Sequence, residues 1–259
     1  MTPSAAREAL VAGLTGSDGR FAGNRVSASA SIEAVAGPGG VTRLPVLASQ
    51  VPLVLRRTPE SVYLVGGAAG PLGGDSLALH ITVGAGAFLR VRTAAASIAL
   101  PGLDGRESVL RVSATVGAGG RLEYLPEPLV VTTGARHATL VSVTLSAGAS
   151  LVLRDEVLLG RHGERGGTAR STLRVSYAGR PLLRHSVEVS GTDAVSRGPA
   201  LLAGHRAVGT LLRVSEVETA ETLVTATPEV AVMPLAGPGF LVTALARDAV
   251  TLRRRLTTP

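Results

Sequence analysis

The chain has 259 residues, 45% of them hydrophobic but only 2% aromatic, so its core must be built from Val, Leu and Ala. It contains no cysteine, which excludes disulfide bonds and thiolate metal sites. The net charge is +7, so acidic partners are expected. All 26 basic residues are arginines, which excludes chemistry that needs a lysine, such as a Walker A loop or a Schiff base.

The N-terminal segment, MTPSAAREALVAGLTG, lacks the basic start and the long apolar stretch of a signal peptide. No run of 18 apolar residues occurs in the chain, so neither a membrane span nor a membrane partner is predicted. Three Tyr, three Phe and no Trp offer few stacking platforms, and we predict no nucleic-acid partner. The expected location is the cytoplasm.

One pattern repeats along the chain: a strand of alternating apolar residues, a glycine-rich turn and a second strand. The strand LALHITV at 77–83 is its clearest start, because every second residue is a large aliphatic one. The first and last copies are looser than the three between them. In chain order the units span 26–47, 77–96, 107–125, 137–159 and 229–246.

A single hairpin is only marginally stable, and stacking hairpins buries their apolar faces together. The sequence therefore predicts one mainly β domain over 1–259, with stacked β-hairpins in a two-layered or solenoid-like structure. An ordinary β-sandwich that shares only the turn chemistry is the alternative. Residues 198–212 suit a helix or a strand, and 247–256 suit a helix, so one or two short helices are expected near the C-terminus. Residues 160–170 are predicted to form a loop.

The letters GDSL at 74–77 raise the hypothesis of an esterase nucleophile at Ser76. In that enzyme family the serine opens a helix, whereas an alternating strand follows Ser76 here. The family also needs a later Asn and an Asp-x-x-His pair. The one asparagine is Asn24, ahead of the serine, and no such pair occurs. An esterase is therefore a remote alternative.

The five histidines stand alone, without the spacing of a metal site, and are interpreted as surface or core residues. His162 is noted because it shares a loop with Glu164. Carboxylates within apolar segments are more informative, because a buried unpaired carboxylate is costly. Each must be paired with an arginine, be hydrogen-bonded to backbone N–H groups, or line a wet passage that attracts cations. The carboxylates are Asp75, Glu123, Asp155 and Glu156, and Arg154 or Arg161 could pair with Asp155 or Glu164.

Four blocks in order resemble the UreD family of urease accessory proteins, called UreH in some organisms. They are GGD at 73–75, RVRTAAAS at 90–97, RLEYLPEPLVVTTGAR at 121–136 and LVLRDEVLLGRHGERG at 151–166. The resemblance covers roughly 45–190. Ala94 replaces an expected Gln, and the C-terminal third matches poorly, which indicates a divergent member.

This resemblance implies a β-rich, non-catalytic scaffold that binds UreF, which recruits the GTPase UreG. The assembly would dock on apo-urease and help deliver Ni²⁺, with no permanently bound cofactor, and a dimer of the accessory complex is one arrangement it allows. It implies an internal passage for nickel in transit, with Asp75, Asp155 and Glu164 as its acidic residues. A β-solenoid module that binds an anionic polymer is the alternative function.

Overall fold

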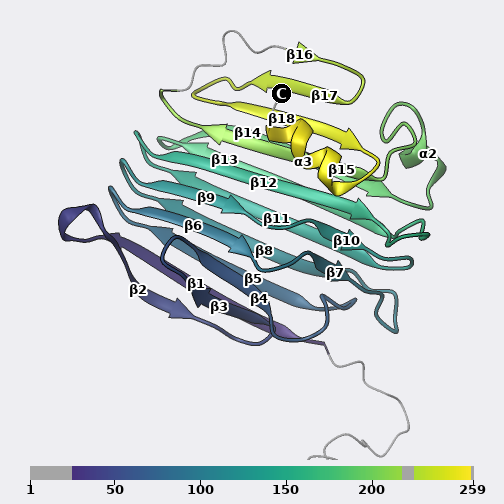
Figure 1. Cartoon of the computed structure of the whole chain (residues 1–259), viewed down its shortest axis with the longest axis horizontal. Coiled ribbons are helices and arrows are strands. Elements are labelled where there is room, and N and C mark those ends of the chain that lie inside the picture. Colours follow the sequence, from purple (N-terminus) through teal and green to yellow (C-terminus); the bar gives the residue numbers. More distant parts are fainter. Residues whose placement is uncertain (1–24, 218–224, 258–259) are drawn as a thin grey trace, which may run out of the picture.

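The computed structural model describes residues 25–217 and 225–257, which form two β-sheets, short α2 and a C-terminal helix, α3 (Figure 1). The strands are β1 Ser27–Ala36, β2 Thr42–Ala48, β3 Leu53–Arg57, β4 Val62–Gly66, β5 Ser76–Val83, β6 Phe88–Thr93, β7 Ser97–Ala99, β8 Ser108–Val116, β9 Arg121–Leu125, β10 Leu129–Val131, β11 Arg136–Leu145, β12 Ser150–Leu159, β13 Thr168–Tyr177, β14 Arg180–Ser190, β15 Ala207–Val214, β16 Thr225–Ala226, β17 Val230–Pro234 and β18 Phe240–Ala246. The helices are η1 Pro38–Gly40, a 3₁₀ turn, α2 Ala194–Arg197 and α3 Ala249–Thr257.

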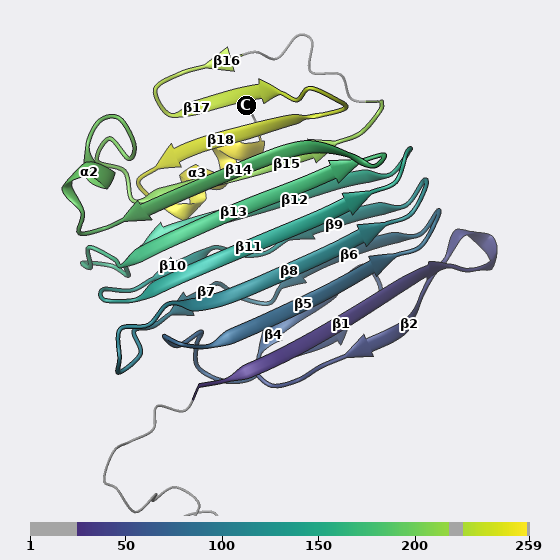
Figure 2. The ribbon, with the colours of Figure 1, turned by 180° about the vertical axis from the view of Figure 1, so that it is seen from behind.

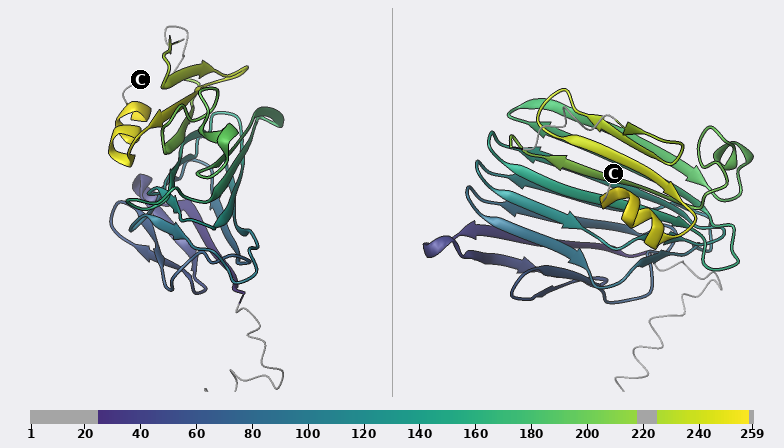
Figure 3. Two further views of the ribbon diagram at one scale, coloured as in Figure 1. Left: turned by 90° about the vertical axis from the view of Figure 1, so that its right-hand side faces the viewer. Right: turned by 45° about the horizontal axis from the view of Figure 1, so that its top comes forward.

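The two sheets lie face to face as two layers (Figure 3). The seven-stranded sheet has the order β14-β13-β11-β8-β5-β1-β2. The larger sheet has the order β16-β17-β18-β15-β12-β9-β6-β4-β3, and β10 joins it by pairing with β12 and with β7. The mainly β, two-layered and solenoid-like architecture with a C-terminal helix is confirmed.

The three central repeat units differ from the expected hairpins, because their two strands do not pair with each other. β5 and β6 lie in opposite sheets, as do β8 and β9, and β11 and β12. Each strand pairs in parallel with its counterpart in the next unit: β5 with β8, β8 with β11, β6 with β9 and β9 with β12. The units are therefore β-arches, whose strands face each other through their apolar side chains.

The two looser units, at the ends of the series, are true hairpins. β1 pairs antiparallel with β2, and β17 pairs antiparallel with β18. The stack of parallel arches is thus flanked by antiparallel strands on both sides. The sequence of 198–212 suits either a helix or a strand, and its second part lies in strand β15. α3 confirms the helix expected at 247–256.

Glycines at the arch turns allow neighbouring turns to stack closely. A Cβ added to Gly117 would lie 2.7 Å from the backbone nitrogen of Ala85 in the preceding arch. Real Cβ atoms essentially never approach backbone atoms so closely. The glycine-rich turns are therefore needed for contact between arches as well as for reversal of the chain.

Alternating burial along the strands places the core between the sheets. In β5, for example, Leu77, Leu79, Ile81 and Val83 are buried and the intervening residues are exposed or half-buried. The largest hydrophobic cluster fills this space, a second lies beneath α3, and a third lies beside β7 and β10. α3 packs on β18, β15 and β12 of the larger sheet (Figure 1).

Candidate functional site

A polar break interrupts the core between its first and third hydrophobic clusters. On β12, Asp155 lies between the buried residues Leu153 and Val157, and its side chain points inward as theirs do. Ser171 on β13, in the other sheet, donates a hydrogen bond from its hydroxyl to the Asp155 carboxylate. One carboxylate thus bridges the two layers. Burial raises the pKa of Asp155 above its ordinary value, and the Ser171 hydrogen bond opposes that shift.

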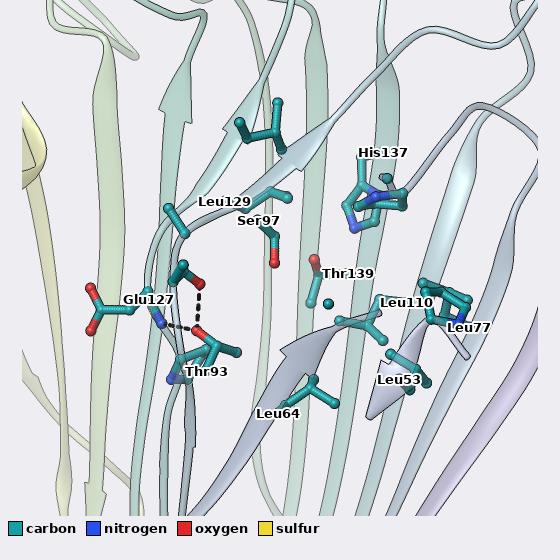
Figure 4. Close-up of a pocket in the computed structure, with 18 of the residues that line it drawn as sticks. Leu53, Leu64, Leu77, Thr93, Ser97, Leu110, Glu127, Leu129, His137 and Thr139 are labelled. Carbon is teal, nitrogen blue, oxygen red and sulfur yellow. Dashed lines mark hydrogen bonds between the residues drawn. The ribbon is translucent and has the colours of Figure 1, made fainter. Parts of the chain in front are cut away.

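A cavity of about 530 Å³ lies between the sheets on one side of this bridge. Its walls are largely aliphatic, as in most pockets for small ligands. Figure 4 shows Leu77, Leu110, Thr139 and His137 on strands of the seven-stranded sheet, facing Leu53 and Leu64. The lining also includes Thr93, Ser97, Tyr124, Glu127, Leu129, Arg154, Asp155, Glu156 and Arg161.

A second, much smaller cavity of about 20 Å³ lies on the other side of Asp155. This volume holds about one water molecule. Ser171, Thr210 and His185 supply its polar lining. The Nε2 atom of His185 is buried and has no hydrogen-bond partner among the described residues. Burial lowers the pKa of His185, which favours the neutral imidazole, the form that binds metal ions.

His137 is a second buried imidazole, on the wall of the large cavity. Its Nδ1 lies 2.8 Å from the Ser108 hydroxyl, and its side chain is almost completely buried. Burial lowers the pKa of His137 to about 4, so the ring is neutral at pH 7. The sequence singled out neither His137 nor His185, because each stands alone on a strand and its neighbours come from distant segments.

Charged residues at the edge of the large cavity form a network with α3. Arg253 of α3 binds Glu127 with two hydrogen bonds of 3.0 Å and Glu156 with bonds of 3.2 and 2.5 Å. The Glu156 side chain is fully buried, and the Nε atom of Arg154 lies 3.3 Å from it. α3 is therefore tied by charge to the wall that contains Asp155.

The expected acidic residue Asp75 does not line either cavity. Its two carboxylate oxygens accept hydrogen bonds from the backbone N–H groups of Val26 and Leu72, each at 2.9 Å. Asp75 is buried and joins the turn before β5 to the start of β1. Gly74, with a φ of 94°, makes the turn possible, so the GGD segment has a clear structural use.

Glu164 lies apart from Asp155, in the loop between β12 and β13. Arg161 donates to both carboxylate oxygens through Nε and Nη2, at 3.1 and 2.8 Å. These bonds and one from the Arg161 backbone lower the pKa of Glu164 to about 2. Glu164 lines a third cavity, beside α2, and not the cavity of Asp155. The expected Arg161–Glu164 pair is present. Residues 160–167 form a loop as predicted, but 168–170, also predicted as loop, begin strand β13.

Glu123 and Ser76 both lie in settings that account for them without catalysis or metal binding. Glu123 is paired with arginines, as one hypothesis required, since Arg90 and Arg121 each lie 2.5 Å from it. Ser76 begins strand β5 and no helix, and its hydroxyl accepts a hydrogen bond from Arg111 at 3.2 Å. This setting differs from the one that a GDSL-type nucleophile requires.

The donor atoms around Asp155 are oxygen and nitrogen, and they are few. Within 25–217 and 225–257, no group of three or more His, Cys, Asp or Glu side chains is arranged to hold a metal ion. Asp155 and His185 could supply one carboxylate and one imidazole to a divalent ion. Such a pair suits brief contact better than storage, because structural metal sites use four protein ligands.

The fold and the cavities define a stacked β-arch protein with a partly polar interior. The family model for the UreD urease accessory protein matches residues 8–258, and the chain belongs to this family. The "Urease accessory protein UreD" of Frankia alni is 45% identical, with 90% of this chain and 91% of that protein covered. That of Streptomyces coelicolor is also 45% identical, with 89% and 94% covered. The membership supports a role in urease maturation. None of the helices in the described ranges has the length and apolar character to cross a membrane.

Proposed function

We propose that this chain is a non-catalytic scaffold for urease maturation, which binds UreF and UreG and helps deliver Ni²⁺ to apo-urease through its interior. Family membership supports the maturation role. Asp155, which lines both the large cavity and the small one, is the single observation that carries the proposed route. An ion that moves from the large cavity to the small one would pass the carboxylate of Asp155.

The ligand chemistry around Asp155 supports transit. A conduit must bind an ion well enough to admit it and weakly enough to release it. Nickel stands high in the Irving–Williams order, so several imidazoles or thiolates would hold it too firmly. One carboxylate, the imidazole of His185 and the hydroxyls of Ser171 and Thr210 line the small cavity. Because the small cavity holds about one water molecule, the ion would exchange most of its water shell for these ligands as it passes.

The other two acidic residues have supporting parts in this proposal. Asp75 fixes the turn 72–75, next to Gly70 and Pro71 in the wall of the large cavity. Glu164 holds Arg161, which also contributes to that wall. We therefore assign direct contact with the passing ion to Asp155 and His185, and positioning of the cavity walls to Asp75 and Glu164.

The test of the route uses variants of the two contact residues. Urease is matured with Asp155→Ala, His185→Leu or wild-type protein, and its nickel content is measured by mass spectrometry. Asp104→Ala and His80→Leu are matched controls, because both residues are exposed. We expect several-fold less nickel with the first two variants, while the accessory complex still assembles. Normal nickel content with both would rule out this route.

The proposed partners are tested separately from the metal. The two edges of the seven-stranded sheet, β2 and β14, leave backbone groups unpaired, which favours association with another protein. We expect the chain to be poorly soluble alone and to become soluble on co-expression with UreF. A chain that stays monodisperse alone and does not bind UreF contradicts the scaffold role.

A further inference from the structure

The outer face of the seven-stranded sheet is bare in the part of the chain that the structure describes. α3 packs on the other sheet, and Figure 2 shows β13, β11, β8 and β5 with no helix across them. This face is broad because its strands are long and in register: nine residue pairs join β11 to β8. It has no part in the cavities described above.

Small hydroxyl side chains form rows across this face. Ser113 of β8 pairs in register with Ser142 of β11, and Thr115 pairs with Thr144. All four are exposed. Neighbouring strands lie about 4.8 Å apart and these side chains are short, so the rows give a locally flat, polar surface. Such a surface fits another folded surface better than it fits a small ligand.

Arginines stand among the hydroxyls. Arg174 of β13 lies directly opposite Arg184 of β14, and Ser142 is the neighbour of Arg174 on the other side. Arg111 is exposed on the same face, on β8. We call the surface around Arg111, Arg174 and Arg184 the basic face.

One carboxylate of the described ranges, Glu188, is exposed on the same face of β14, four residues from Arg184 and opposite Arg170. None of its three arginines forms an ion pair with a described carboxylate, whereas Arg170 at the edge of the face pairs with Glu107 at 2.8 Å. Like charges directly opposite each other destabilise a sheet. A fold that keeps Arg174 beside Arg184 therefore gains if carboxylates from outside bind between them. Guanidinium groups bind carboxylates through two parallel hydrogen bonds.

We propose that the basic face docks an acidic surface of a folded partner protein during urease maturation. Charge complementarity and the flatness of the hydroxyl rows support this occupant. Duplex nucleic acid is a poorer fit, because its grooves are read by an inserted helix or ribbon, and this face has neither. Only the choice of partner proteins for the test rests on the function proposed above.

The test compares two double variants of the full chain with the same change in charge. Arg174→Glu/Arg184→Glu reverses the basic face, whereas Arg56→Glu/Arg57→Glu reverses two exposed arginines on β3 of the other sheet. Each protein is mixed with purified apo-urease, UreF and UreG, and complex formation is measured at 50 and 300 mM salt. Hydrogen exchange of the wild-type complex maps the protected strands, and circular dichroism verifies folding. If charge reversal prevents folding, Arg174→Gln/Arg184→Gln, which removes both charges, replaces the reversed variant in the comparison.

We expect the basic-face variant to bind at least tenfold more weakly at low salt, the β3 variant to bind normally, and β11, β13 and β14 to be protected. Equal binding by both variants would overturn the docking proposal and leave the maturation role intact. If wild-type protein forms no complex at all, the maturation role fails as well. Binding of duplex DNA is measured on the same variants, and its loss in the basic-face variant with the protein complex unchanged would also overturn the proposal.

Discussion

The carboxylate of Asp155 accepts a hydrogen bond from Ser171 across the interior, and so joins a strand of one sheet to a strand of the other. The two residues are 16 positions apart in the chain. Hydrophobic packing elsewhere between the layers is not directional, but this bond is, so it fixes how β12 and β13 lie relative to each other. The same carboxylate lines both cavities, so the residue that joins the sheets is also accessible to an ion inside the protein.

Replacing Asp155 with Asn should stabilise the protein at pH 7. Burial raises the pKa of Asp155, so the folded state disfavours the ionised carboxylate relative to the unfolded state. Asn keeps an acceptor for Ser171 without the charge, and we expect the free energy of unfolding to rise by about 1 kcal/mol. Urea denaturation of both proteins measures the difference.

The pH dependence of the stability gained by Asp155→Asn is the control for this prediction. The folded state binds the proton of Asp155 more tightly than the unfolded state, whose carboxyl titrates near 3.8. Wild-type stability therefore falls as pH rises from this value through the raised pKa of the folded state. The advantage of Asp155→Asn should shrink as pH falls and vanish below the ordinary value. A gain that is constant from pH 3.5 to pH 8 would have another cause.

His137 should make the protein less stable in mild acid. Its pKa falls from the ordinary 6.5 to about 4 on folding, so the unfolded state binds the proton more tightly. Stability is complete above pH 6.5 and is lost as pH falls toward 4, by about 3 kcal/mol in total at 1.36 kcal/mol per pKa unit. His137→Gln should flatten this part of the stability curve. An unchanged slope in that variant would show that the ring is not buried as neutral imidazole.

Removing Arg253 from the charge network of α3 should lower the free energy of unfolding by more than is usual for a partly exposed side chain. Arg253→Ala leaves the fully buried Glu156 without its closest partner, since Arg253 approaches it to 2.5 Å. Removal of one member of a buried pair costs about 3–5 kcal/mol, and because Arg253 is 31% exposed we expect about 2–3 kcal/mol. Thermal or urea unfolding measures it.

The neighbouring residue supplies the matched control for Arg253. Arg254 is exposed on the same helix, and its replacement by Ala changes helix propensity little. Arg254→Ala should alter the free energy of unfolding by less than about 0.5 kcal/mol. Equal losses in the two variants would indicate a general effect on α3 rather than the network.

The sequence predicts the layers of this fold better than the way each unit joins them. Alternation in LALHITV shows which face of a strand is buried, and glycines show where the chain reverses. Neither tells whether the next strand lies beside the first or opposite it. A hairpin and an arch both bury the same face of 77–83. The arch is favoured here because three similar units can pair in parallel with one another, a relation between distant segments.

The candidate site shows the same limit of local information. Asp155 can be found from the sequence, because a carboxylate stands out in an apolar strand. Among the described residues no arginine forms an ion pair with it, and its bond to Ser171 depends on how the two sheets lie together. His185 gives no local signal, since alternation on β14 only places it on the inner face. Its unpartnered nitrogen becomes evident only when β12 and β15 lie opposite.

Stacking of the arch turns gives a test of the fold itself. Gly117→Ala would place a Cβ 2.7 Å from the Ala85 nitrogen, a backbone atom that cannot rotate away. The β8 and β5 arches would have to separate locally, which we expect to cost about 2 kcal/mol. Gly66→Ala is the control, because its nearest contact would be an ordinary 3.7 Å. It should change stability by less than about 0.5 kcal/mol. If the two substitutions prove equally mild in urea denaturation, the turns do not stack as closely as the parallel pairing of β5 and β8 requires.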